Sequence, residues 1–295
     1  MKTLTIFTPT YNRAHTLKRT YESLCRQTCN DFEWLIIDDG STDNTKGLVN
    51  TWIADNVLSI RYIYQENGGL YTGYNTAYAN ITTELCVCID SDDFMPDNAV
   101  ELIIGHWSKY GGDNYAGITG LDFFLDGNPI GGYFPDGLKQ VHIIDLSLKK
   151  IHKGDTKQVM RTDIMKSVAP MTGFKGEKNF NPIYLLLKAD DMLPSLVLNK
   201  NLCFVEYQQT DSMSAGIYRQ YINSPHSFAK MRRLEMTLKR NTWRNLIRIA
   251  IHYNSSCIIG NENDWLSTSP RKLLTIMTRP LGWMLSRYIR FKAKI

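Results

Sequence analysis

The sequence of 295 residues contains no run that approaches the roughly 18 consecutive apolar residues needed by a membrane-spanning helix. The segment from Met1 to Phe7 lacks the long apolar stretch of a secretory signal, so we expect none. The six cysteines are scattered, and no histidine stands at ligand spacing near Cys25 and Cys29. We therefore expect reduced thiols, rather than disulfides or a zinc site, in a cytoplasmic protein.

Acidic residues are absent after Asp264, whereas seven lysines and arginines follow it. Because the whole chain has a formal net charge of +5, residues 1–264 carry a net charge of −2. Apolar residues are interleaved with these cations, which is typical of a basic amphipathic helix on an anionic membrane surface. We expect a break near Pro280 and Gly282. Such a helix would hold the protein peripherally on the inner face of the cell membrane; the alternative is a helical lid packed on the preceding domain, with its basic residues solvated.

Nucleic acid is a poorer partner for this basic end of the chain. Its aromatic residues lie among apolar helix positions rather than on an exposed strand face, where bases would stack. We therefore expect no nucleic-acid partner.

Short apolar runs alternate with helix-like spacing in the first third of the chain. The predicted strands are Leu4–Thr8, Phe32–Ile37, Ser59–Gln65 and the run from Leu85 to Ile89, and the predicted helices are Thr16–Gln27, Thr45–Asp55, Tyr74–Ala79 and one that begins near Asp97. Later segments predict a hairpin at Phe123–Ile130, a helix at Ile183–Leu187 and a strand at Cys203–Tyr207. This order predicts an α/β fold, with a mostly parallel central sheet flanked by helices.

Three carboxylates, Asp90, Asp92 and Asp93, follow the predicted strand that begins at Leu85. Clustered like charges repel unless a cation neutralises them. Mg²⁺ or Mn²⁺ suits such oxygens, and Mg²⁺ is usually shared between one or two carboxylates and substrate phosphates. The pattern predicts a divalent metal and a phosphate-bearing ligand. The alternative is a solvated acidic turn that caps the next helix.

Chemically distinctive residues also follow the other three predicted strands, namely Tyr11, the pair Asp38 and Asp39, and the pair Gly68 and Gly69. Ligands of parallel sheets bind outside the carboxyl ends of the strands, where all of these residues would fall. Each has a purely structural alternative: a core tyrosine, a turn with a helix N-cap, and a plain glycine turn.

Four segments resemble, in order, the motifs of family 2 glycosyltransferases: Thr8–Asn12, Ile37–Asp43, Glu66–Gly69 and Asp90–Asp93. The resemblance implies a GT-A fold and a metal-dependent, inverting hexosyltransferase. It implies a UDP-sugar donor, Mn²⁺ or Mg²⁺ bridging the diphosphate, and an acceptor that is a growing glycan or a lipid-linked saccharide. The corresponding process is cell-surface polysaccharide synthesis.

The resemblance also assigns residues to roles. The nucleotide-sugar site would comprise Thr8, Pro9, Tyr11, Asp38, Asp39, Gly68, Gly69, Asp90 and Asp92, and the metal ligands would be Asp92 and Asp93. Tyr11 would line the nucleobase pocket, Asp39 would accept a hydrogen bond from uracil N3, and Asp38 would lie near the ribose or support the loop. A carboxylate that accepts from an N–H discriminates uracil from cytosine.

The general base is less plain. Inverting transfer requires a base within hydrogen-bond reach of the acceptor hydroxyl. The acidic dipeptide usual in the family is replaced by Asn181–Ile183, so Glu177 and Asp191 are the candidates; the alternatives are a loop charge and a solvated helix end. The chain also departs from the family at Leu70–Thr72, where relatives commonly carry a basic residue and a histidine.

We predict a GT-A domain at residues 1–225, with a nucleotide-binding half at 1–105 and an acceptor-side half at 106–225, followed by a helical basic extension at 226–295. Two rival functions are a sugar nucleotidyltransferase and a non-catalytic protein that binds a nucleotide-sugar or glycan. The first would favour a glycine-rich phosphate loop with a cation near the amino terminus, which Thr8–Tyr11 lacks. The second is kept open by the unclear base.

Overall fold

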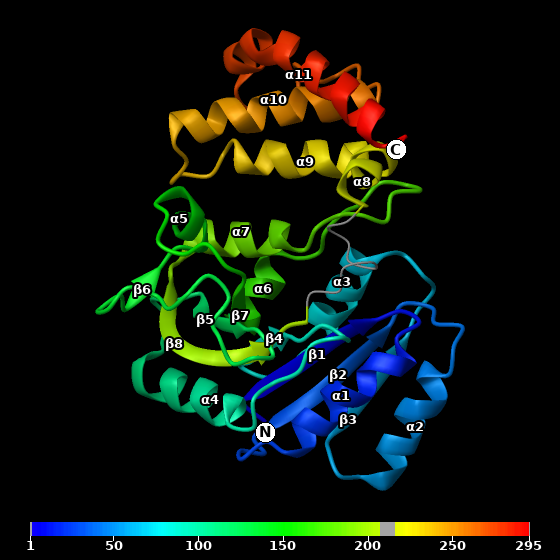
Figure 1. Ribbon diagram of the computed structural model, residues 1–295, viewed down its shortest axis with the longest axis vertical. Coiled ribbons are helices and arrows are strands. Elements are labelled where there is room, and N and C mark those ends of the chain that lie inside the picture. Colours follow the sequence, from blue (N-terminus) through cyan, green and yellow to red (C-terminus); the bar gives the residue numbers. More distant parts are fainter. Residues whose placement is uncertain (1, 207–215, 295) are drawn as a thin grey trace. The chain divides into compact units, whose positions relative to one another are not determined.

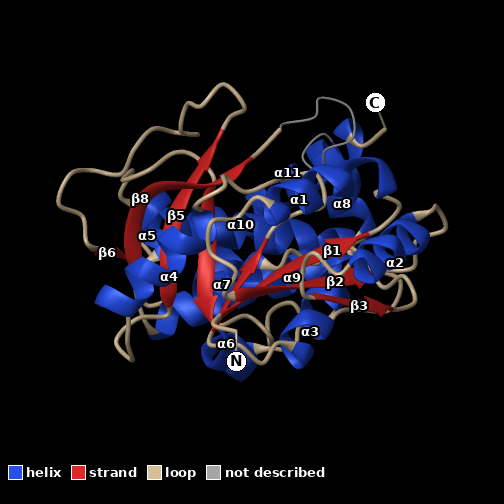
Figure 2. Ribbon diagram, turned by 90° about the horizontal axis from the view of Figure 1, so that it is seen from below, coloured by secondary structure: helices blue, strands red, loops and turns tan. Residues whose placement is uncertain are grey.

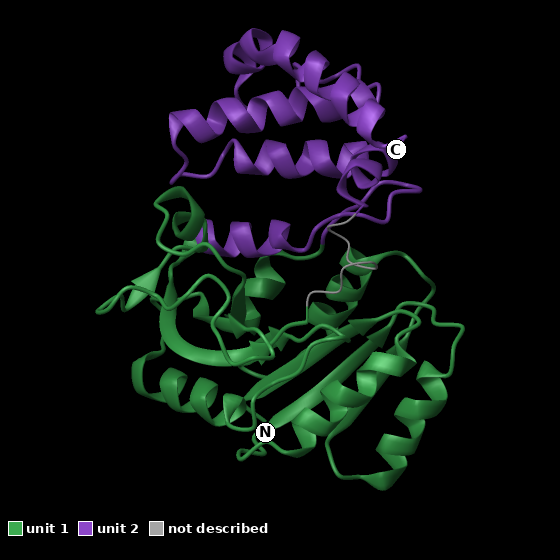
Figure 3. Ribbon diagram, in the orientation of Figure 1, with its two compact units in different colours: residues 1–170, 192–206 green, residues 171–191, 207–295 purple. Residues whose placement is uncertain are grey.

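The computed structural model describes residues 2–206 and 216–294. The chain divides into two compact units (Figure 3). Unit 1 comprises residues 1–170 and 192–206, and unit 2 comprises residues 171–191 and 207–295.

Unit 1 is built on an eight-stranded sheet, counted over the described residues, with the strand order β3-β2-β1-β4-β7-β5-β8-β6 (Figure 1). Its strands are β1 (Leu4–Thr10), β2 (Phe32–Asp38), β3 (Ile60–Tyr64), β4 (Leu85–Cys88), β5 (Gly117–Phe123), β6 (Gln140–Val141), β7 (Thr156–Arg161) and β8 (Ser195–Phe204). The first four strands are parallel, and β7 runs antiparallel between β4 and β5. The early strand–helix order thus gives the parallel half of the sheet that the sequence predicts.

Helices cover both faces of this sheet (Figure 2). They are α1 (Ala14–Cys25), α2 (Thr45–Asp55), α3 (Leu70–Asn80), α4 (Ala99–Tyr110), α5 (Ile143–Leu148) and α6 (Thr162–Val168). Strand β1 shows why two layers form, because successive side chains point to opposite faces. Leu4 and Ile6 join the core that includes α1, α2 and α4, whereas the ring of Phe7 contacts Tyr74 and Tyr78 of α3.

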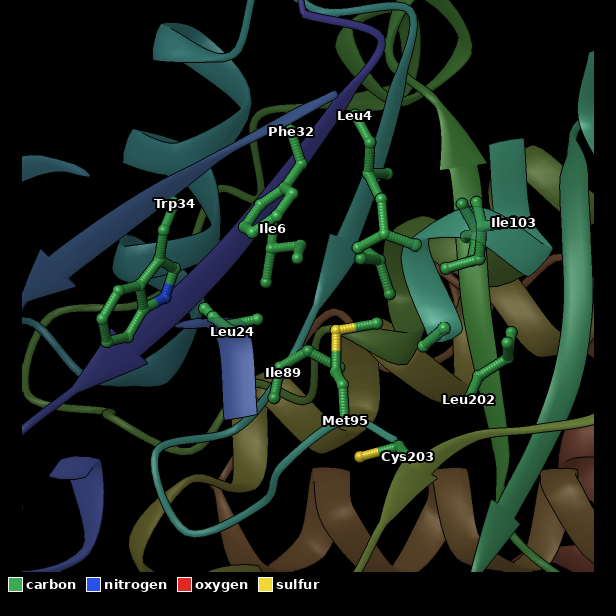
Figure 4. Close-up of a cluster of buried hydrophobic side chains, with 14 of the residues drawn as sticks. Leu4, Ile6, Leu24, Phe32, Trp34, Ile89, Met95, Ile103, Leu202 and Cys203 are labelled. Atoms are coloured by element: carbon green, nitrogen blue, oxygen red, sulfur yellow. The ribbon is translucent and has the colours of Figure 1, made fainter. Parts of the chain in front are cut away.

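The larger core of unit 1 is closely packed around β1 and β2 (Figure 4). Trp34 is fully buried, and its indole Nε1–H donates to Thr8 Oγ1 at 2.9 Å, so its one polar group is satisfied. Tyr21 of α1 and Trp52 of α2 stack with ring centroids 4.3 Å apart. Because each fully buried apolar side chain of this size contributes about 1.5–3 kcal/mol, this core fixes the strands whose ends carry the candidate site.

Several predicted boundaries differ from those observed. Helix α3 begins at Leu70 rather than near Tyr74, because Gly69 adopts φ +94° and forms its N-cap. Strand β8 begins at Ser195, well before the predicted Cys203, and the predicted end at Tyr207 lies outside the described residues. The hairpin is confirmed by a hydrogen bond from the Phe124 amide to the Asn128 carbonyl at 2.9 Å.

Unit 2 is helical among its described residues. Its helices are α7 (Ile183–Met192, whose last residue belongs to unit 1), α8 (Ile217–Asn223), α9 (Pro225–Glu235), α10 (Trp243–Ile259) and α11 (Lys272–Lys292). The core lies between α9 and α10, around Ala229, Ile249 and Tyr253. Among the described residues, none of the helices has the length and apolar character needed to cross a membrane.

The predicted break near Pro280 and Gly282 is wrong, because α11 continues through both residues. Packing against α10 holds the helix together there. A Cβ atom on Gly282 would lie 2.3 Å from Cβ of Asn254 in α10, so glycine permits this close approach rather than ending the helix. Pro280 is exposed, and its ring therefore does not interfere with the packed face.

The predicted division at residue 225 does not coincide with the two units. Residues 171–191 are tied to the C-terminal helices within unit 2. The Lys230 ammonium donates to the Thr172 carbonyl at 2.7 Å, and the Asn179 amide donates to Ser224 Oγ at 3.3 Å. These contacts place part of the predicted acceptor-side half in the same compact unit as the basic extension.

Candidate active site

The carboxyl ends of β1 to β4 meet at one edge of the parallel sheet. Strand β1 lies between β2 and β4, which makes the β1/β4 boundary the point where the strand order reverses. Ligands of open α/β sheets bind at such a point. Tyr11, Asp39, Gly69 and the Asp90–Asp93 segment follow the four strands at this edge, so the fold brings together the loops that the sequence singled out.

The loop after β1 is locked to the loop after β2. Asn12 adopts a left-handed conformation with φ 53°, and its side-chain oxygen accepts from the Thr42 amide at 2.8 Å. The Asn12 amide in turn donates to Ser41 Oγ at 2.8 Å. This clamp leaves the ring of Tyr11 48% exposed, which excludes a buried core tyrosine at this position and suits a flat surface for a base.

Asp38 supports this edge from inside. Its side chain is fully buried, one oxygen accepts from the Ser41 amide at 2.7 Å, and the other accepts from the Tyr62 hydroxyl at 2.5 Å. Burial and the adjacent Asp38 carboxylate raise the pKa of Tyr62, so the phenol keeps the proton that it donates. Asp38 therefore holds the loop after β2, the second of the two roles considered for it.

Asp39 ties the loop after β2 to the start of α3. Its Oδ2 accepts from the Gly69 amide at 2.9 Å, and its Oδ1 accepts from the Gly68 amide at 3.1 Å and from the Gln65 side chain at 2.7 Å. The Thr72 hydroxyl also lies 3.2 Å from Oδ1. Since a carboxylate oxygen offers two lone pairs, Oδ2 keeps one for a further donor.

The paired glycines are required by this geometry. Gly69 has φ +94°, a region that residues with a Cβ rarely adopt. A Cβ on Gly68 would lie 2.7 Å from the Thr72 side chain. The backbone at this point is thus exceptionally close to the first turn of α3, whose N-terminus is suited to anions.

The acidic segment after β4 is anchored mainly through its backbone. Its chain turns through a hydrogen bond from the Asp93 amide to the Asp90 carbonyl at 3.0 Å. From α1, the Arg19 guanidinium donates to the Asp92 carbonyl at 2.5 Å, and the Thr20 hydroxyl donates to the Asp93 carbonyl at 2.7 Å. Asp90 is exposed and Asp92 is half-buried. Within residues 2–206 and 216–294, the Asp92 carboxylate has no hydrogen bond or ion pair.

Asp93 points into the protein instead. It is 6% exposed, and its Oδ2 lies 3.7 Å from the ammonium nitrogen of Lys157 in β7. Oδ1 of Asp122 in β5 also lies 3.7 Å from the same ammonium nitrogen. Burial raises the pKa of Asp93 to about 7, against the opposing effect of Lys157, and burial likewise raises that of Asp122 to about 6. The two carboxylates outweigh burial at Lys157 and raise its pKa.

Sequence reasoning missed Lys157 and Asp122. Asp122 lies in β5 (Gly117–Phe123) and Lys157 lies in β7 (Thr156–Arg161), and neither segment was predicted as a strand. The available signal in each segment was a charged residue among residues that are otherwise compatible with a strand. A charge at a buried strand position needs a partner. That requirement indicates that each residue has a partner, and the structure shows that they are partners of each other.

The two candidates for the general base both make contacts within unit 2. Glu177 accepts from the amides of His226 and Ser227 at 3.0 and 2.7 Å and from the His226 ring at 2.7 Å, which caps the start of α9. Asp191 accepts from the Lys239 amide at 2.9 Å. That either residue acts as a base stays a prediction.

The donor set after β4 fits a hard cation that is shared with phosphates. In the part of the chain that the structure describes, no three histidine, cysteine, aspartate or glutamate side chains are grouped as a complete metal site. Mg²⁺ is usually bound by only one or two carboxylates, with substrate phosphates completing the shell. The half-buried Asp92 and the exposed Asp90 meet this requirement, whereas Asp93 is paired with Lys157.

Comparisons with known proteins agree on the family. The sequence model of glycosyl transferase family 2 matches residues 5–129, which contain all four loops of the site. Chondroitin synthase of Escherichia coli is 37% identical over 106 residues, covering 36% of this chain and 15% of the relative. Glycosyltransferase GlyG of Streptococcus pneumoniae is 29% identical over 140 residues, covering 42% of this chain and 46% of the relative. The chain thus spans less than half the length of these curated relatives.

Solved structures agree on the fold. The fragment of S. aureus TarS that comprises its residues 1–349, solved in complex with UDP-GlcNAc, has a TM-score of 0.63 at 16% identity, with 100% of this chain and 92% of that fragment covered. Mannosyltransferase PcManGT of Pyrobaculum calidifontis, solved with GDP-Man and Mn²⁺, has a TM-score of 0.54 at 13% identity, with 99% and 83% covered. The predicted GT-A fold is confirmed. Residues 5–129, the segment that holds the four loops of the site, match the model of glycosyl transferase family 2.

Proposed function

We propose that this chain is a metal-dependent, inverting glycosyltransferase that moves a hexose or amino-hexose from a UDP-sugar to a glycan or lipid-linked saccharide. The observation that carries the proposal is the Asp92 carboxylate, which has no hydrogen-bond or ion-pair partner among the described residues and lies near the exposed Asp90 at the edge of the sheet where Tyr11 is exposed. The match to the family model, the polysaccharide synthases among the relatives and the UDP-GlcNAc complex of TarS support it. Peripheral attachment to the inner face of the cell membrane would bring the enzyme to a lipid-linked acceptor.

The chain's own residues would bind the donor in three places. The ring of Tyr11 would stack on the uracil, and the remaining lone pair on Asp39 Oδ2 would accept the N3–H of the base. The backbone at Gly68 and Gly69 would lie against the diphosphate, since no side chain prevents close approach there. Thr8 and Pro9, which are both buried in β1, would close the inner side of the base pocket.

A divalent metal, Mn²⁺ or Mg²⁺, would neutralise the charge that develops on the departing diphosphate. Asp92 would be its main protein ligand. Asp93, which the sequence analysis assigned to the metal together with Asp92, would instead hold the acidic segment in place through Lys157. The acceptor hydroxyl requires a base, for which Glu177 and Asp191 remain our candidates.

The test is a panel of nucleotide-sugars scored by thermal shift with and without Mn²⁺, because a ligand that binds only the folded state stabilises it. We expect UDP-sugars to raise the melting temperature, more so with Mn²⁺. Asp92→Asn should remove the Mn²⁺-dependent part, whereas Asp136→Asn, on an exposed loop of the same unit, should retain it.

Product analysis then separates the candidate functions. Release of UDP from a UDP-sugar supports transfer. Release of pyrophosphate would support a sugar nucleotidyltransferase, and tight UDP binding without either product would support a binding protein. The absence of both binding and turnover across the panel would refute the proposal.

A further inference from the structure

Helix α11 has an unusual distribution of side chains. The face packed within unit 2 consists largely of small or polar residues, namely Thr275, Thr278, Gly282, Ser286 and Ile289. The outward face carries large apolar side chains that are 47–72% exposed, and we call it the apolar face of α11: Leu273, Met277, Leu281, Met284, Tyr288 and Phe291. A helix on the surface of a water-soluble domain normally shows the opposite arrangement.

The orientation of α11 is fixed by specific contacts with α10, beside which it lies (Figure 1). The Asn254 side chain of α10 is fully buried and donates to the Thr275 carbonyl at 2.8 Å and to the Thr278 hydroxyl at 3.0 Å. Gly282 lies against the same residue, where even a methyl group would overlap. Rotating α11 to bury its apolar face would break these bonds and place Met or Leu against Asn254. The exposure is therefore built into the packing.

Cations border the apolar face. Arg287, Arg290, Lys292 and Lys294 are exposed near its C-terminal half, and Lys272 is exposed at its start. No acidic residue occurs after Asp264. A second copy of this face would bring like charges together, so charge complementarity favours an anionic surface over self-association.

We infer that the apolar face of α11 binds the surface of an anionic lipid membrane. The helix lies in the plane of the interface, with its apolar side chains among the upper acyl chains and its lysines and arginines at the headgroups. The absence of a spanning helix from the described residues agrees with this in-plane placement. This inference specifies the surface for the peripheral attachment included in the proposed function, but it is argued from unit 2 alone and does not depend on glycosyl transfer.

Flotation of the full chain with vesicles tests the inference. We expect binding to equimolar phosphatidylcholine and phosphatidylglycerol, weaker binding to pure phosphatidylcholine, and a decrease with added salt. The double variant Met277→Glu with Met284→Glu should bind about tenfold less or weaker still, because two apolar side chains no longer enter the bilayer. Both side chains are at least 60% exposed, so the variant should keep the native melting temperature.

The matched control is Asn223→Glu with Asn263→Glu, which adds the same two charges at exposed positions of unit 2 outside α11. It should retain most of the binding. If the native chain does not float with anionic vesicles, or if the Met277 and Met284 variant floats as well as the control, the inference is wrong. A different result would assign the face to a second copy of the chain. In that case the native chain would be a dimer by light scattering and would not float with vesicles, and the Met277 and Met284 variant would be a monomer.

Discussion

The ammonium nitrogen of Lys157 lies 3.7 Å from Oδ2 of Asp93, in the interior of unit 1 behind the acidic segment. It lies at the same distance from Asp122, so one cation serves two buried carboxylates. Asp93 is the last of three aspartates in its segment. The ion pair therefore links the position of the neighbouring Asp92 to β7, a strand that lies outside the predicted nucleotide-binding half at residues 1–105.

Replacing Lys157 with methionine should destabilise the protein by about 3–5 kcal/mol, because two buried carboxylates lose their counter-charge. Chemical denaturation with a chelator present measures this free energy of unfolding. Lys139→Met removes the same charge from an exposed position of unit 1 and should change it little. A loss of under about 1 kcal/mol for Lys157→Met would show that the ion pair does not stabilise the fold.

The raised pKa of Asp122 predicts how stability depends on pH. Its pKa rises from 3.8 to about 6 on folding, so the folded state holds a proton that the unfolded state releases. The resulting stabilisation is complete below about pH 4 and is lost as the pH rises to about 6, a change of about 3 kcal/mol. Asp122→Asn should flatten this part of the pH profile, measured without metal. Asp136→Asn should leave it intact, and an equal slope in both variants would contradict the prediction.

Tyr11→Ala should weaken UDP binding by about 1–3 kcal/mol through loss of stacking. Its melting temperature should match the native value, because the ring is 48% exposed and contributes little to the core. Calorimetric titration of UDP measures the effect, and Tyr11→Phe, which keeps the ring, should bind normally. Undiminished binding by Tyr11→Ala would remove this ring from the nucleobase pocket.

Asp39→Ala should weaken UDP binding by about 1.5–3 kcal/mol. It should also lower the ratio of the affinity for UDP to the affinity for CDP. The second effect separates direct recognition of the base from loss of loop structure, which would weaken both nucleotides equally. Asp43→Ala is the matched control, because Asp43 also braces these loops, through the Ala14 and Thr45 amides. A UDP to CDP ratio unchanged from the native protein would restrict Asp39 to holding the loops together.

Glu177→Gln should lower the free energy of unfolding by about 1–3 kcal/mol, because the carboxylate accepts three hydrogen bonds at the start of α9 and is buried. Thermal and chemical denaturation measure this, with the exposed Asp264→Asn as a control within unit 2. An unchanged stability combined with lost turnover would instead identify Glu177 as the base.

The parallel half of the fold could be predicted because each strand there is a continuous apolar run that ends at a turn signal. Phe32–Asp38 is an example: its residues are almost all buried, and a glycine with φ +86° follows at residue 40. Strands β5 and β7 could not be identified in this way, because each carries a charged or glycine residue in a buried position. The pairing of the two strands and the contacts of Lys157 with Asp122 and Asp93 make those residues compatible with the interior.

The candidate site was predictable as a set of loops but not as a set of contacts. The sequence predicted Asp38 and Asp39 at a ligand pocket. It could not show that the Asp38 carboxylate accepts hydrogen bonds from the Ser41 amide and the Tyr62 hydroxyl. Those bonds depend on tertiary structure, since Tyr62 lies 24 residues away. The break expected at Pro280 was wrong for a related reason, because packing on α10 outweighs the local preference.

The bonds from Asp39 to Gly68 and Gly69 join segments 29 and 30 residues apart in the sequence. The start of α3 is therefore already immobilised in the free protein, and a nucleotide arriving there does not have to order it. The entropy of arranging these loops is lost during folding rather than at each encounter with a donor. A donor site of this kind would need no reordering between the release of one nucleotide and the binding of the next.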